Sequence, residues 1–98
     1  MSTKKIIRYK LKADRVAENE QRIKAVFRQV HERQPAGTHY TVYKLADGVR
    51  FVHIVSYETE EAHQALITLP AFRDFQGQDK DRFEEPPIPS DAEEIGAY

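Results

Sequence analysis

The stretch THYTVYKLADGVRFVHIVSY, residues 38–57, decides the fold of this chain. It contains two alternating runs, rich in β-branched and aromatic side chains, on either side of Asp47-Gly48, a dipeptide that strongly favours a hairpin turn. The pattern predicts two antiparallel strands over residues 38–46 and 49–58. A two-residue turn would place these pairs on one side of the sheet: Ala46–Val49, Lys44–Phe51, Val42–His53, Tyr40–Val55 and Thr38–Tyr57.

The sequence before the hairpin predicts one strand and one helix. Residues 6–11 alternate between apolar and charged side chains, as in a half-buried strand. Apolar side chains then recur at helical spacing from Val16 to Val30, which predicts a helix capped by Asp14 and ending near Gln34. The apolar row of the strand consists of Ile7, Tyr9 and Leu11.

The sequence after the hairpin predicts a broken helix and a final strand. Thr59 can cap a second helix, and Pro70 can begin a further short helical segment that ends at Gly77. The prolines of residues 86–89 predict an extended connector, and residues 92–98 a short last strand.

The predicted order of strand, helix, strand, strand, helix and strand corresponds to a ferredoxin-like α+β fold with an antiparallel sheet. Its first and third strands would be central, and the helices would cover one face. The opposite face carries Thr41, Tyr43, Val52 and Ile54, which would form an exposed apolar patch. We therefore expect a second copy of the chain to cover it, giving a homodimer.

Length and charge limit the classes of function. The 98 residues are expected to form a single domain, residues 1–98, because a core of this size does not divide into two. The 15 Lys and Arg residues against 16 Asp and Glu residues give a net charge of −1 and are interleaved, so we expect no nucleic-acid partner.

Cysteine usage and the N-terminus bear on location. The chain has no cysteine, which excludes disulfides and thiolate metal sites and suits a reducing compartment, so we expect a cytoplasmic protein. Residues 1–5 lead directly into the first predicted strand, which leaves no signal peptide or membrane span there. We accordingly expect no membrane partner.

His53 is the most informative candidate for chemistry. It lies in the middle of a predicted strand, in one row with Phe51, Val55 and Tyr57, on the face predicted to meet the helices. Burial would lower the pKa of the imidazole and keep it neutral, which is the form that a general base needs. A hydrogen-bonded core histidine explains the same position, so both interpretations remain open.

Other candidate residues gather around this row. Tyr57 and Tyr9 are predicted to join His53 in a catalytic group that holds a substrate oxygen. The histidines lack the spacing of a metal site, so we expect no metal and no cofactor. The residues expected to bind an apolar or aromatic small molecule are His63, Phe72, Phe27 and Phe51.

Several motifs resemble the antibiotic-biosynthesis-type monooxygenase family, also called the ABM family, of dimeric α/β-barrel proteins. They are Gln-Pro-Ala-Gly at residues 34–37, Tyr40 shortly after it, the run over residues 52–62, and Pro-Ala-Phe at residues 70–72. The resemblance covers nearly the whole chain and implies a homodimer whose two sheets form a barrel. It also implies a pocket between sheet and helices in each subunit.

The resemblance further implies an activity. Members include oxygenases that need no cofactor and act on polycyclic phenols or quinols, and enzymes that degrade haem. The family's pocket aromatic, often Trp, falls on Tyr57, and a histidine of many members aligns with Leu66, one turn after His63. The haem-degrading residues are absent, because the chain has no Trp and Gln76 stands at the haem-ligand position.

Two main hypotheses of function follow. In the first, the protein is a cofactor-independent monooxygenase in which His53 accepts the proton of a phenol or enol, and the resulting anion reacts with O₂. In the second, the same fold is a homodimer that binds a small ligand or serves a structural role without catalysis. Another one-base reaction, such as an isomerisation, is a third alternative.

Overall fold

The computed structural model describes residues 3–98. Two 3₁₀ turns, Ala13–Arg15 and Lys80–Arg82, accompany the longer elements. In chain order these are β1 (Thr3–Leu11), α1 (Val16–Arg33), β2 (Thr38–Lys44), β3 (Arg50–Tyr57), α2 (Glu60–Ile67), α3 (Pro70–Gln76) and β4 (Phe83–Ala92). The predicted ferredoxin-like α+β fold is confirmed.

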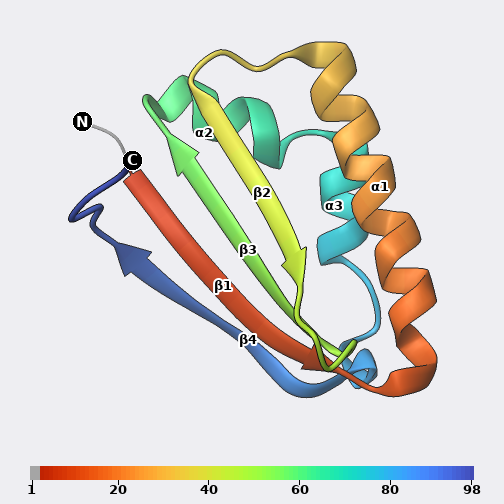
Figure 1. Ribbon diagram of the computed structural model, residues 1–98. Helices are drawn as coiled ribbons and strands as arrows, with labels where there is room; N and C mark the ends of the chain where they lie inside the picture. The colour runs from red at the N-terminus through yellow and green to blue at the C-terminus, as the bar shows by residue number, and fades with distance from the viewer. Residues whose placement is uncertain (1–2) are drawn as a thin grey trace.

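The four strands form one antiparallel sheet in the order β2-β3-β1-β4. β1 and β3 are therefore central, as predicted. Among residues 3–98, the three α-helices lie on the same face of the sheet, and no helix of this part of the chain lies over the other face (Figure 1). Within the described residues, the chain's own elements therefore enclose side chains of the sheet on the helix-covered face.

The register of the central hairpin is confirmed. Lys44 pairs with Phe51, and Val42 pairs with His53. The turn itself is longer than predicted, because the strands end at Lys44 and Arg50 and the amide of Gly48 bonds to the carbonyl of Leu45. Gly48 takes a φ of 77°, a backbone conformation that glycine adopts without strain. The longer loop leaves the pairing unchanged.

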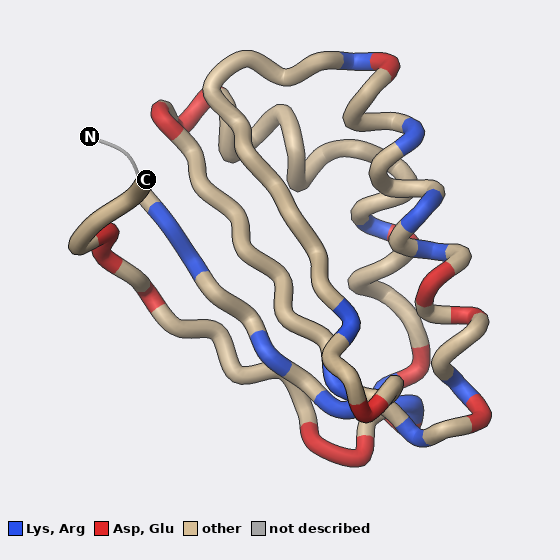
Figure 2. The backbone as a smooth tube through the Cα atoms, viewed as in Figure 1, with Lys and Arg blue, Asp and Glu red and all other residues tan. Residues whose placement is uncertain are grey.

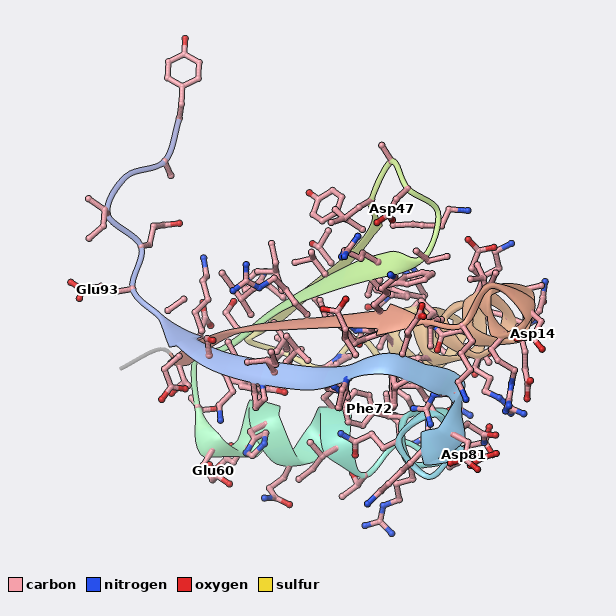
Figure 3. All side chains as sticks on the ribbon, turned by 90° about the horizontal axis from the view of Figure 1, so that it is seen from below. Asp14, Asp47, Glu60, Phe72, Asp81 and Glu93 are labelled. Atoms are coloured by element: carbon pink, nitrogen blue, oxygen red, sulfur yellow. The ribbon has the colours of Figure 1, made fainter. Side chains whose placement is uncertain are left out.

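The core lies between the sheet and the helices. Alternation along β1 and β3 sends Tyr9, Leu11 and Phe51 into it, where α2 contributes Leu66. Proline at the first position of α3 begins that helix as predicted, and its Phe72 lies between the helices and the sheet in Figure 3. A compact apolar layer thus surrounds the middle of β3.

The start of α1 differs from the prediction. Asp14 does not cap the helix but lies within the 3₁₀ turn, and Arg15 occupies the cap position without a side-chain hydrogen bond. The amide of Arg15 bonds instead to the carbonyl of Lys12, which closes the tight turn. The predicted cap of α2 is confirmed, since the hydroxyl of Thr59 accepts from the amide of Ala62.

The last strand was wrongly predicted as residues 92–98. β4 instead runs through the proline-rich segment that was expected to be a connector. It lies at the edge of the sheet, where alternate amides face away from the neighbouring strand, so missing N–H groups are tolerated. The pairing with β1 also shifts register between Arg8 and Lys10, opposite Pro86 and Pro87.

Charged residues lie mainly on α1, the strand ends and the turns (Figure 2). Basic and acidic side chains are interspersed, as in the ion pair of Arg22 with Glu18 at 2.6 Å. Within residues 3–98, no helix has both the length and the apolar composition needed to cross a membrane.

Candidate functional site

His53 is at the centre of the site and is held on both sides by tyrosines. Its side chain points from β3 towards the helices and is only 3% exposed. The hydroxyl of Tyr9, on β1, lies 2.7 Å from Nε2, and the hydroxyl of Tyr40, on β2, lies 2.7 Å from Nδ1. Both ring nitrogens therefore have a hydroxyl partner, and three neighbouring strands meet at one imidazole.

Helix α1 adds a fourth polar side chain. Asn19 is 2% exposed, and its Nδ2 donates to the Tyr9 hydroxyl at 3.0 Å. A buried asparagine in a helix costs free energy unless its amide has partners, so this contact stabilises the position of both residues. The result is a continuous chain of hydrogen bonds from Asn19 through Tyr9 and His53 to Tyr40.

Burial keeps the three hydrogen-bonded rings of His53, Tyr9 and Tyr40 neutral. It lowers the pKa of His53 to about 4, because the imidazolium is poorly solvated there. It raises the pKa of Tyr9 to about 12, although the Asn19 hydrogen bond and the charge of Arg82 oppose the rise. Burial also raises the pKa of Tyr40. At neutral pH the site therefore holds one neutral imidazole between two protonated phenols.

This site should make the fold sensitive to acid. The pKa of His53 falls from 6.5 to about 4 on folding, so between these values the unfolded chain binds a proton that the folded chain does not. The free energy of unfolding is therefore not reduced by His53 above pH 6.5, and it falls as the pH drops from 6.5 towards 4. We expect a loss on the order of 3 kcal/mol in the free energy of unfolding.

Urea unfolding across this pH range would measure the loss. The variant His53→Leu, which has no group to titrate there, should show a smaller decrease. Equal pH dependence of the two proteins would contradict the assignment of the acid sensitivity to His53.

A cavity of about 590 Å³ opens beside the hydrogen-bonded chain. It lies between the helix-covered face of the sheet, α3 and the segment that begins β4. Its wall combines the three polar rings with a largely aromatic surface, and includes Tyr9, Tyr40, His53, Phe72, Phe75 and Phe83. Such a mixture of apolar walls and a few polar groups is typical of small-molecule sites.

A second hollow adjoins this cavity. The two share Ile7, Tyr40 and Phe72 in their walls, and the second continues to Tyr57 and His63. The rings of Tyr57 and His63 pack together with centroids 4.6 Å apart. The sequence-predicted residues Tyr57 and His63 thus lie in the neighbouring hollow rather than in hydrogen-bond contact with His53.

The other candidates lie in different places. Phe72 lines both hollows. Phe51 is buried in the core and stacks on Tyr9 at 5.5 Å, while Phe27 packs on Tyr40 at 5.0 Å. Phe27 and Phe51 both line a separate, smaller hollow beside α1.

Three residues of the site were missed by sequence reasoning. Tyr40 shares the alternation of His53 and lies two residues from its direct partner, so the predicted register could have found it. Asn19 lies three residues after Val16 in the apolar stripe of α1. A polar side chain at such a position indicates a buried group that needs a hydrogen-bond partner, so the sequence could have pointed to it. Arg82 lies in a charged segment that gave no signal.

Among residues 3–98, no cluster of three or more His, Cys, Asp or Glu side chains has the arrangement of a metal site. The polar groups that converge here are instead the imidazole, two phenols and one amide described above. The imidazole and the phenols can donate and accept protons, whereas the amide takes part by hydrogen bonding; none of these groups is a carboxylate.

The fold and site define a small ferredoxin-like α+β protein with a histidine held between two tyrosine hydroxyls beside an aromatic cavity. The sequence matches the model of the antibiotic biosynthesis monooxygenase family over residues 4–78. The chain therefore belongs to this family, which supports a monooxygenase-like role and confirms the resemblance stated above. No curated protein matches the sequence.

Solved structures agree on the fold. A Mycobacterium tuberculosis protein superposes with a TM-score of 0.79 at 17% identity, covering 99% of this chain and 98% of its own. A Nitrosomonas europaea protein named for the same family gives 0.78 at 17% identity, covering 96% and 90% of the two chains. A Pseudomonas aeruginosa protein gives 0.76 at 13% identity, covering 97% and 95%. At these identities the likeness concerns the fold alone.

Proposed function

We propose that this protein is a cofactor-independent monooxygenase that acts on a phenol- or quinol-type aromatic molecule bound in the cavity beside His53. One observation carries the proposal: a neutral, buried imidazole is held between two tyrosine hydroxyls at the wall of a cavity lined by aromatic rings. Family membership supports the class of reaction.

The substrate's proton would reach His53 through Tyr40, since both ring nitrogens already have hydroxyl partners. With the ring proton on Nε2, Nδ1 accepts from the Tyr40 hydroxyl, which lines the cavity. A substrate hydroxyl can then donate to Tyr40 while Tyr40 passes its own proton to Nδ1. The product is an imidazolium that donates to both tyrosines and a phenolate that accepts from Tyr40.

The low pKa of His53 makes this transfer depend on the substrate. An imidazolium alone is poorly solvated in this site, as its pKa of about 4 indicates. When the phenolate forms beside it, the opposite charge replaces the lost solvation and raises the proton affinity of the ring. The base would therefore be strong only while substrate is bound.

The substrate would supply all the electrons. Its anion is electron-rich at ring carbon and transfers electrons to O₂, forming a carbon–oxygen bond in a peroxide. The peroxide takes a proton back from the imidazolium through Tyr40. Loss of water from the resulting hydroperoxide, whose carbon still carries a hydrogen, converts that carbon to a carbonyl. One oxygen atom stays in the product and the other leaves as water, so no external reductant is required.

The aromatic lining supports an aromatic substrate. Phe75 lies 5.6 Å from the His53 ring in a stacked arrangement, and Tyr9 meets Phe83 edge to face at 5.3 Å. Aromatic rings in a protein pair favourably with other rings in these geometries. A flat aromatic substrate would gain such contacts on entering the cavity.

We also propose that the protein is a homodimer through the sheet face that no helix covers. Thr41 and Tyr43 are exposed there, Tyr43 by 55%, and Val52 and Ile54 are only half-buried. An apolar surface of this kind is typical of an interface between identical subunits. The helix-covered face, which holds the cavity, would remain free in such a dimer.

A second candidate function is ligand binding without catalysis. The observation that favours it is that both nitrogens of His53 are hydrogen-bonded within the protein, as in a purely structural core histidine. This candidate predicts that aromatic molecules bind but are not oxidised.

Oxygen consumption distinguishes the two. The purified protein, dialysed against EDTA, would be tested with a panel of quinols and phenols in an oxygen electrode. We expect protein-dependent uptake of one O₂ for each molecule of at least one substrate. Binding of panel members with no uptake above the protein-free rate would favour the non-catalytic candidate.

A further inference from the structure

Arg82 is a buried cation at one end of the cavity. It lies in the 3₁₀ turn between α3 and β4, is 7% exposed, and lines the cavity wall. Its guanidinium lies over the ring of Phe83, 4.2 Å from the centroid, and 5.9 Å from the centroid of Phe75. The group is thus fixed against two aromatic rings of the cavity.

The charge of Arg82 has no carboxylate partner within residues 3–98. Its terminal nitrogens donate to the backbone carbonyls of Asp79 and Phe75, at 2.8 and 3.3 Å, and its Nε–H has no acceptor among the residues that the structure describes. The Asp79 carboxylate lies 3.8 Å from Arg15 instead. A guanidinium remains protonated at every ordinary pH, so this site holds a buried positive charge with an unused donor.

The rest of the cavity wall is also free of acidic groups. Lys80 is a second basic residue of the lining, and of the residues 3–98 that line the cavity none is Asp or Glu. An anion entering this space would meet two cations and no opposing carboxylate. Arg is well suited to this role, because its planar fork matches the two oxygens of a carboxylate.

We propose that the cavity takes a hydroxyaryl carboxylate, with the carboxylate on Arg82 and the hydroxyl group at Tyr40 and His53. Phe75 lies next to both His53 and Arg82, since its ring stacks on the imidazole and also lies beside the guanidinium. A flat ring that carries a carboxylate and a hydroxyl at opposite ends would present one group to each of these two kinds of polar side chain in the cavity wall. The inference rests on the proposed function for the role of the hydroxyl end.

The test compares two probes of the same ring and similar size, one with an anionic carboxylate and one with a neutral amide in its place. A hydroxynaphthoic acid and the neutral amide of the same acid would be titrated into the wild-type protein by calorimetry at neutral pH, without O₂. We expect the acid to bind about 10- to 100-fold more tightly, the range expected of a hydrogen bond to a buried charged group. Equal affinities, tighter binding of the amide, or no binding of either probe would overturn the inference.

Variants of Arg82 test whether this residue causes the tighter binding of the acid. Arg82→Met should abolish the preference for the acid, whereas Arg28→Met, which removes an exposed arginine of α1, should retain it. If loss of the backbone contacts unfolds Arg82→Met, the variant Arg82→Lys keeps a charge but lacks the fork and should reduce the preference. An unchanged preference in a folded Arg82 variant would also overturn the inference.

The outcome is separable from that of the proposed function. Oxidation of neutral quinols without a preference for the acid would contradict the carboxylate site at Arg82 and leave the proposed monooxygenase function standing. A clear preference for the acid without O₂ uptake on any compound would instead contradict the proposed monooxygenase function and leave the carboxylate site standing.

Discussion

Replacing His53 with Leu should lower the turnover of a confirmed phenolic substrate by about 10²- to 10⁴-fold, the usual effect of losing a general base. Leu removes the imidazole that joins the hydroxyls of Tyr9 and Tyr40. The substrate's proton then has no acceptor beyond Tyr40, and the phenolate that reacts with O₂ does not accumulate. Steady-state oxygen uptake at saturating substrate measures the effect.

Two further variants make this result specific. His53→Gln keeps a polar side chain but cannot take up a proton, so it should lose a similar share of activity. His31→Leu makes the same change at an exposed position of α1 and should leave turnover unchanged. Full activity in a folded His53→Leu protein would end the assignment of His53 as the base.

Replacing Ile54 with Asp should convert the proposed dimer into a monomer. Ile54 lies in the middle of the uncovered sheet face, opposite Ile6 of β1 and Thr41 of β2. An unpaired carboxylate buried in an interface costs roughly 3–5 kcal/mol, and a two-fold dimer would contain it twice. Sedimentation equilibrium at micromolar concentration measures the change.

The matching control adds the same charge elsewhere. Gln21→Asp places an acidic residue on the exposed side of α1 and should leave the dimer intact. A wild-type protein that is monomeric at micromolar concentration, or an Ile54→Asp protein that stays dimeric, would contradict the proposed interface.

The hairpin shows why much of the fold could be predicted from sequence. Alternation in β2 and β3 admits one assignment of faces, and the Asp47-Gly48 turn then determines which residues meet. The pair of Val42 with His53 follows from these two facts alone. Because β1 has the same alternation, the row that brings Tyr9 next to His53 was also predictable.

β4 could not be predicted in the same way. Three prolines in residues 86–89 are evidence against a strand unless the strand is known to lie at an edge. Edge position depends on the order of strands in the sheet, which local patterns do not contain. The register shift at Pro86 and Pro87 is likewise visible only once β1 is beside them.

The candidate site shows the same division. His53 and Tyr9 were predictable from one strand each, because alternation alone turns them towards the helices. Asn19 and Arg82 come from a helix and a 3₁₀ turn, and only tertiary packing brings them to the same cavity. Tyr57 shares the row of His53 but lies four residues away along β3, which places it in the adjoining hollow.

The most direct test of the proposed monooxygenase function is to trace the atoms of O₂ into the product. Wild-type protein and a substrate found in the oxygen-electrode panel would be incubated under ¹⁸O₂, and the product analysed by mass spectrometry after short reaction times. A monooxygenase of the proposed kind should place one ¹⁸O atom in each product molecule, and none when the label is supplied as H₂¹⁸O. A product labelled from water, or formed equally well without O₂, would contradict the proposed function.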